Sequence, residues 1–127
     1  MNLGPITFEP GLGGFVLRLE GLWSLSLFSL WQMALEEAIA WYCPDRPFTL
    51  LIDARAFAPQ CFEVQKGFSQ FLWNHPVLKS QCLALAGVVG PDHLLTHQAL
   101  SGPTQAYFSE PALAQAWLKE RKPPWAV

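Results

Sequence analysis

The stretch that most constrains the fold is residues 48–55, where an apolar run ends abruptly in Asp53 and Arg55. Within it, residues 48–52 are almost continuously apolar and do not alternate between apolar and polar side chains. Strands of this kind are buried on both faces, as in parallel or mixed sheets that are covered by helices. A second run of the same kind spans residues 82–89. Two such strands separated by a helical pattern predict an α/β fold.

The remaining patterns complete an alternation of strands and helices. Residues 6–9 and 15–20 predict two strands of an antiparallel hairpin, because a glycine-rich turn joins them. Apolar residues at helical spacing predict four helices, near residues 22–43, 59–74, 91–99 and 109–122. A last short strand is predicted at residues 104–108, before the final helix. With right-handed crossovers, the order β-β-α-β-α-β-α-β-α predicts a mixed, mostly parallel five-stranded sheet with covering helices. We expect a single domain over residues 1–122 and a C-terminal tail at 123–127.

Composition and charge exclude several classes of protein. Hydrophobic residues make up 51% of the chain and charged residues only 14%, which is well below the roughly 25% of an average domain. The net charge of −2 provides no positive field for nucleic acid, so we expect no nucleic-acid partner. The three cysteines contain no CxxC pair, and the N-terminus has no signal-peptide pattern. We therefore expect a cytoplasmic protein without a disulfide framework or a zinc site.

The longest uncharged segment, residues 21–35, must be tested as a membrane span. It is 15 residues long and contains serines, whereas a span needs roughly 20 apolar residues. A buried helix with no stable membrane crossing is therefore the expectation. This helix is apolar on two faces, one of which includes Leu30 and Trp41. Two interpretations of Leu27, Trp31 and Leu35 stay open: they belong to the core, or they form the face of a homodimer or of an apolar-ligand cleft.

Candidate functional residues gather where the two buried strands are expected to end. Open α/β sheets bind ligands at the carboxyl ends of their strands. This rule points to Asp53, Arg55 and Phe57 after the first buried strand, and to Pro91 and Asp92 after the second. The alternative for Asp53 and Arg55 is a local ion pair without a ligand.

The other reactive side chains do not match a known catalytic or metal-binding pattern. Cys61 is expected near a helix N-terminus, where the dipole can activate a thiol, but a buried and inert thiol is the simpler interpretation. His93 and His97 share a helix face, yet two ligands do not make a metal site. No phosphate-binding loop, dinucleotide fingerprint or nucleophile motif occurs. We therefore expect no cofactor, no metal and no enzymatic activity.

The order of elements resembles the STAS superfamily, named for sulphate transporters and anti-anti-sigma factors, and within it the SpoIIAA-like branch of small bacterial proteins. The matching residues are Gly21-Leu22-Trp23 before the long helix, Leu51-Ile52-Asp53 at a strand end, the strand 83–89, and Ala106-Tyr107-Phe108 followed by Ala114-Gln115-Ala116-Trp117-Leu118. The resemblance implies a regulatory or protein-interaction module. A carrier or sensor of a small apolar ligand, such as a lipid, is the alternative.

One part of the family pattern is missing from this chain. Anti-anti-sigma members carry a phosphorylatable serine at the helix that follows the central strand. Here no serine or threonine lies between Asp53 and Ser69. The resemblance therefore implies an interaction module without this phosphorylation switch. Its partner is not identified by any residue.

Overall fold

The computed structural model describes residues 6–127, which form one five-stranded sheet in the order β1-β2-β3-β4-β5. The strands are β1 Ile6–Glu9, β2 Gly14–Gly21, β3 Phe48–Phe57, β4 Cys82–Val88 and β5 Gln105–Phe108. β1 pairs with β2 in the antiparallel sense, and every later neighbour is parallel. The predicted mixed α/β fold with an N-terminal hairpin is therefore confirmed.

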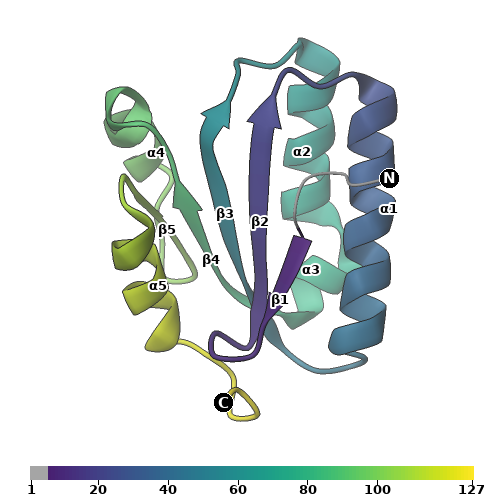
Figure 1. The fold of residues 1–127 in the computed structure, drawn as a ribbon, viewed down its shortest axis with the longest axis vertical. Coiled ribbons are helices and arrows are strands. Elements are labelled where there is room, and N and C mark those ends of the chain that lie inside the picture. Colours follow the sequence, from purple (N-terminus) through teal and green to yellow (C-terminus); the bar gives the residue numbers. More distant parts are fainter. Residues whose placement is uncertain (1–5) are drawn as a thin grey trace.

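Helices cover both faces of the sheet (Figure 1). The helical elements are α1 Leu25–Tyr42, α2 Phe62–Asn74, α3 Pro76–Gln81, the 3₁₀ turn η1 Pro91–His93, α4 Leu94–Gln98 and α5 Pro111–Lys119. The first three lie on one face, whereas α5 packs on the other face against β3, β4 and β5. None of the helices in residues 6–127 combines the length and apolar character that a membrane crossing requires.

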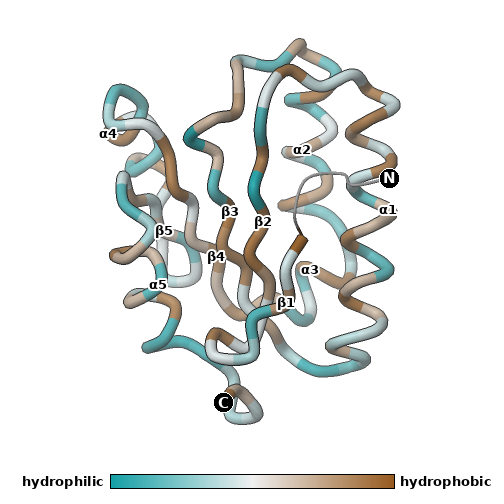
Figure 2. The backbone as a smooth tube through the Cα atoms, viewed as in Figure 1, coloured by the Kyte–Doolittle hydropathy of each residue, from teal (hydrophilic) through white to brown (hydrophobic). Residues whose placement is uncertain are grey.

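The two faces of the sheet bury two separate apolar clusters. On the side of α1 and α2, Leu50 and Ile52 pack among aromatic rings that include Trp31. On the side of α5, Leu51 packs in a cluster with Ala84, Ala86 and Val88 of β4 and with Leu118. Alternate residues of β3 thus serve both clusters, which explains its continuous apolar run. Figure 2 shows that β2 and β3 are hydrophobic in their first halves and carry hydrophilic residues towards their carboxyl ends.

The third strand is longer than the sequence pattern predicts. Residues 54–57 are predicted as a loop, but they continue β3 to Phe57. Between Arg18 and Glu20 the register with β2 shifts, because Arg18 pairs with Asp53 whereas Glu20 pairs with Ala56. An extra residue in β3 makes this a β-bulge, which reverses the facing of the residues that follow it. Asp53 therefore lies within the strand and not at its end.

The buried faces of two helices also differ from expectation. In α1 the buried residues are Phe28, Trp31, Leu35 and Ile39. The predicted stripe through Leu30 and Trp41 is wrong, since Trp41 is 80% exposed. In α5 the buried residues are Ala114 and Leu118, although the helical spacing of Leu113 and Ala116 predicts that these two point inward; both are exposed.

The last five residues pack against the body of the protein. Pro123 is fully buried, and the Trp125 ring stacks on Phe8. The Trp125 indole N–H donates to the Pro47 carbonyl at 2.7 Å. Residues 123–127, expected as a tail, thus join the hairpin to the loop that precedes β3.

Candidate functional site

Parallel pairing brings the carboxyl ends of β2, β3 and β4 to one edge of the sheet, at the top of Figure 1. Gln60 ties the segments that leave this edge. Its Oε1 accepts from the Trp23 backbone N–H at 2.8 Å, and its Nε2 donates to the carbonyls of Gly21 and Ala58 at 2.8 and 2.6 Å. A further bond joins the backbone of Ala58 to that of Gly21. The start of α1 and the start of α2 are therefore held as one surface.

This edge contains the largest hollow found in residues 6–127, about 620 Å³, which we call the carboxyl-edge hollow. Its lining comes from the end of β3, the first half of α2, and the segment from β4 through α4. The lining residues are Ala54, Arg55, Phe57, Ala58, Gln60, Gln65, Phe68, Ser69, Val89, Gly90, His93, His97 and Leu100. Arg55 and Phe57 were predicted site residues. Pro91 and Asp92 are exposed immediately beside the hollow, between Gly90 and His93.

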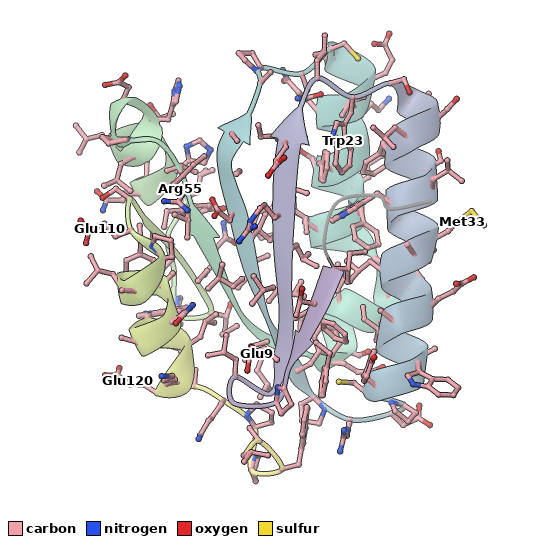
Figure 3. All side chains as sticks on the ribbon, in the orientation of Figure 1. Glu9, Trp23, Met33, Arg55, Glu110 and Glu120 are labelled. Atoms are coloured by element: carbon pink, nitrogen blue, oxygen red, sulfur yellow. The ribbon has the colours of Figure 1, made fainter. Side chains whose placement is uncertain are left out.

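The bulge in β3 orients Arg55 at this hollow. Asp53 Oδ1 accepts from the Arg55 backbone N–H at 3.2 Å and from its Nε at 2.9 Å, and Oδ2 accepts from Nη2 at 2.8 Å. The hydrogen bond from the Arg55 side chain is the main reason that the pKa of Asp53 is below its ordinary value, and Arg18 adds attraction. Figure 3 shows Arg55 beside the upper part of β3. The expected local ion pair is thus present, and it also positions one edge of the guanidinium.

The two histidines of the hollow differ in their roles. His97 Nδ1 lies 2.9 Å from the His93 carbonyl oxygen. Because a carbonyl only accepts, Nδ1 carries a proton, and Nε2 of neutral His97 then offers a lone pair. The His97 ring also packs on Tyr107, with 5.2 Å between ring centroids. Within the described residues, no three His, Cys, Asp or Glu side chains gather as metal ligands.

Large apolar side chains at the same end of the sheet are open to solvent. The exposed fractions are 71% for Leu22, 72% for Phe62, 83% for Leu95 and 60% for Leu100. These residues follow β2, β3 and β4, so they belong to the same edge of the sheet. We call them the apolar rim. Exposed apolar side chains of this size are typical of protein–protein contact surfaces.

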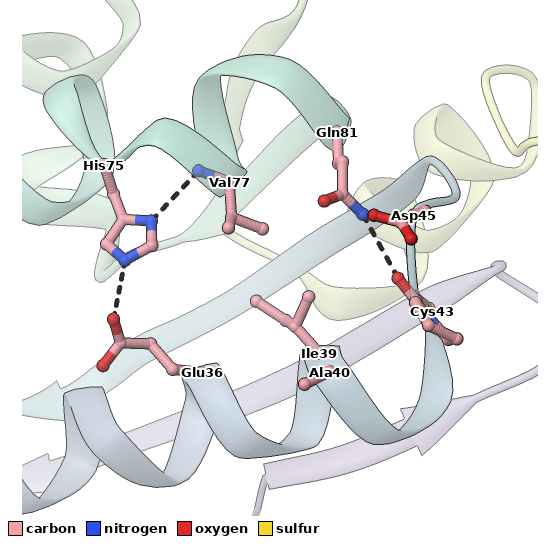
Figure 4. A pocket seen from close by; sticks show the side chains of 9 residues that line it. Glu36, Ile39, Ala40, Cys43, Asp45, His75, Val77 and Gln81 are labelled. Atoms are coloured by element: carbon pink, nitrogen blue, oxygen red, sulfur yellow. Dashed lines mark hydrogen bonds and ion pairs between the residues drawn. The ribbon is translucent and has the colours of Figure 1, made fainter.

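A second, smaller hollow of about 300 Å³ lies between α1 and α3 (Figure 4). Cys43, His75 and Glu36 line it, and these are the residue types of a cysteine nucleophile with its base and acid. The hydrogen bonds do not fit that chemistry. His75 Nδ1 accepts from the Val77 N–H at 3.2 Å, and Nε2 lies 2.7 Å from Glu36 Oε2. Both nitrogens are engaged, and burial raises the pKa of the Cys43 thiol. This hollow is a helix junction in which His75 caps α3.

The two other cysteines differ in exposure, and the expectation of a buried Cys61 thiol is wrong. Cys61 occupies the N-cap position of α2 and is exposed, but its side chain makes no capping hydrogen bond. Burial raises the pKa of the Cys82 thiol to about 12. A thiol with a raised pKa is a poor nucleophile at neutral pH.

The predicted dimer or apolar-ligand face on α1 is mostly interior. Trp31 and Leu35 are 1% and 0% exposed, so they cannot contact a second copy of the chain. Leu27 is half-buried against the same cluster. The space between α1 and the sheet is filled by the aromatic cluster, in which Trp31 contacts Trp23, Phe28, Phe68 and Phe71. The core interpretation of Trp31 and Leu35 is therefore correct.

Sequence reasoning missed Gln60 and His75. Gln60 lies between a proline and a helix start, where a glutamine carries no recognisable signal, because its partners are backbone groups and two of them, Gly21 and Trp23, are distant in sequence. His75 had a signal: it directly precedes Pro76, and a residue before a proline leaves the helical conformation. It therefore ends α2 and begins α3 in one step.

Comparisons with family models, with curated proteins and with solved structures gave no match to this chain.

Proposed function

We propose that this protein is a non-enzymatic interaction module of the STAS type, SpoIIAA-like, that binds a protein partner with the apolar rim and the adjoining loops. The observation that carries the proposal is the exposure of Leu22, Phe62, Leu95 and Leu100 at a single edge of the sheet. Exposed side chains of this size gain free energy when a partner removes them from water. Gln60 fixes the segments that carry Leu22 and Phe62, so little conformational entropy is lost there on binding.

Three features of the molecule support an interaction role over catalysis. The element order on which the resemblance rests is present in the fold. The chain keeps no serine or threonine between Asp53 and Ser69, so partner binding here does not depend on phosphorylation at the start of α2. Finally, the one Cys–His–Glu group in the described structure has both imidazole nitrogens occupied.

The test compares two apolar-to-acidic variants in affinity capture from an extract of the source cells. Phe62→Glu alters the apolar rim at the first residue of α2, whereas Leu113→Glu alters an exposed leucine in the first turn of α5, on the other face of the sheet. A glutamate is favourable near a helix N-terminus, so both variants should fold. We expect a stoichiometric protein partner that is retained by the wild type and by Leu113→Glu, and weakened about tenfold or more by Phe62→Glu.

Equal retention by both variants would place the partner elsewhere, and equal loss from both would point to non-specific apolar adsorption. Light scattering of the purified chain adds a second arm. A concentration-dependent dimer that Phe62→Glu dissolves would identify the partner as a second copy of the chain.

A further inference from the structure

We infer that the carboxyl-edge hollow binds a small organic anion whose apolar body is about the size of one or two fused rings. This inference does not depend on a protein partner, because it concerns the hollow itself and not the apolar rim. It rests on the shape, the lining and the charge of the hollow.

The size and the inner wall of the hollow suit a compact apolar body. A volume of about 620 Å³ falls within the range of roughly 300–1,000 Å³ that is common for small-molecule sites. Phe57 and Phe68 meet edge to face there, with 5.5 Å between ring centroids. Phe57 reaches this position because the bulge turns it towards α2. Val89 and Ala58 extend the apolar lining on either side.

The charge of the lining selects an anion. None of the residues that line the hollow is an aspartate or a glutamate, whereas Arg55 is one of them. Asp53 engages Nε and Nη2 of that guanidinium, and within residues 6–127 no hydrogen bond engages Nη1. Arg18, in register with Asp53 on β2, also attracts that carboxylate. Arg55 is the single arginine or lysine among the lining residues, so the lining supplies one fixed positive charge and no carboxylate. A guanidinium held rigidly in this way is well suited to a carboxylate or a phosphate.

Neutral polar groups complete the rim of the hollow. His97 offers Nε2, because its Nδ1 is bound to the His93 carbonyl. The Ser69 hydroxyl and the Gln65 carbonyl oxygen make no hydrogen bond within residues 6–127, although the Gln65 amide nitrogen donates to Gln60 at 2.7 Å. A pocket with an apolar wall and a few converging polar groups is the usual form of a small-molecule site.

The experiment titrates the ¹⁵N-labelled chain with three probes and follows its amide NMR signals. The probes are 2-naphthoate, which has both the ring body and the carboxylate, 2-naphthamide, which has the body without the charge, and acetate, which has the charge without the body. We expect saturable shifts for 2-naphthoate at residues 54–69 and 89–100. Binding of the amide should be at least tenfold weaker, and acetate should cause no saturable change. Phenyl phosphate in a fourth titration separates a preference for phosphate from one for carboxylate.

Two variants and a matched control locate the site. Arg55→Met removes the guanidinium and should weaken the binding of 2-naphthoate at least tenfold. Arg18→Met removes an arginine that lies outside the hollow and should change the affinity for 2-naphthoate less than threefold. Ser69→Phe fills the hollow from an exposed position of α2 and should abolish the shifts even if Arg55→Met proves unstable. Absence of saturable binding by both 2-naphthoate and phenyl phosphate, equal binding of 2-naphthoate and its amide, or unchanged binding in Ser69→Phe would overturn the inference.

Discussion

Asp53 illustrates how one carboxylate can determine the local course of a strand. It accepts three hydrogen bonds from Arg55, one from the backbone and two from the guanidinium. The backbone bond closes the bulge, and the bulge turns Phe57 towards Trp23 and Phe68. A side chain that resembled a catalytic or ligand-binding group in sequence is therefore first a structural one, and it acts on the candidate site through Arg55.

We predict that Asp53→Asn lowers the free energy of unfolding by about 1–2 kcal/mol at pH 7, since charge-assisted hydrogen bonds are lost. The pKa of Asp53 in the folded chain is below that of the unfolded chain. The contribution of the carboxylate is therefore complete above the unfolded value of about 4 and disappears as the pH falls through the folded value. Urea unfolding of wild type and variant between pH 7 and pH 2.5 measures the difference, which should shrink towards zero in acid.

Asp92→Asn is the control for this pH series, because Asp92 is exposed and its carboxylate makes no hydrogen bond in the described residues. It should unfold like the wild type at every pH. A constant difference between wild type and Asp53→Asn across the whole series would contradict the assignment of the bond to the charged form.

Gln60 is the second residue whose role is set by backbone partners. We predict that Gln60→Ala lowers the free energy of unfolding by about 1–3 kcal/mol. In this variant the partly buried backbone N–H of Trp23 loses its acceptor, and the carbonyls of Gly21 and Ala58 lose a donor. Denaturant unfolding gives the free energy, and amide hydrogen exchange should show faster exchange at residues 21–25. Gln65→Ala removes a single exposed hydrogen bond and should cost less than 0.5 kcal/mol by comparison. An equal loss of unfolding free energy in the two variants would show that Gln60 does not link these segments.

At the scale of the elements, the strands were the most predictable part of the fold. The runs at 48–52 and 82–89 are apolar on both faces, and burial on both faces is what places β3 and β4 inside the sheet. The bulge at Arg55 could not be foreseen, because it depends on pairing with β2 and leaves no mark in the local pattern. The buried face of α1 was also misjudged, since both of its faces are apolar and periodicity cannot choose between them. Figure 3 shows Met33 on the outer side of this helix, away from the sheet.

The junction of β2 with β3 depends on a glycine. A Cβ added at Gly14 would lie 1.9 Å from the Thr49 carbonyl oxygen, which is backbone and cannot rotate away. We predict that Gly14→Ala costs about 3 kcal/mol or more, because the strands must separate where the sheet begins. Gly102→Ala provides the control, since nothing lies within 4 Å of the added atom. Thermal unfolding by circular dichroism compares them, and a stable Gly14→Ala protein would show that β2 and β3 do not approach so closely.

At the scale of the whole molecule, the low charge content is explained by where the apolar residues lie. Much of the apolar surface is buried in two clusters, one on each face of the sheet. The remainder includes the apolar rim, the surface that the proposed partner would cover. The general position of the candidate site could be predicted from the strand ends, but its lining could not. Phe68 and His97 come from α2 and α4, and Leu100 comes from the turn after α4; only the packed structure determines how these segments are oriented.

The last five residues connect parts of the molecule that lie far apart in sequence. The Trp125 ring stacks on Phe8 of β1, the Arg46 guanidinium lies 3.8 Å above it, and its N–H reaches Pro47. We predict that Trp125→Ala lowers the free energy of unfolding by about 2–3 kcal/mol, since a large half-buried ring and its cation–π contact are lost. Trp125→Phe keeps a stacked ring and loses only the hydrogen bond, so it should cost about 1 kcal/mol. Urea unfolding orders the three proteins, and hydrogen exchange at residues 6–9 should accelerate only in the alanine variant. An alanine variant as stable as the wild type would mean that residues 123–127 leave the hairpin in solution, and β1 would then be held by its pairing with β2 and by the stacking of Phe8 on Tyr42 of α1.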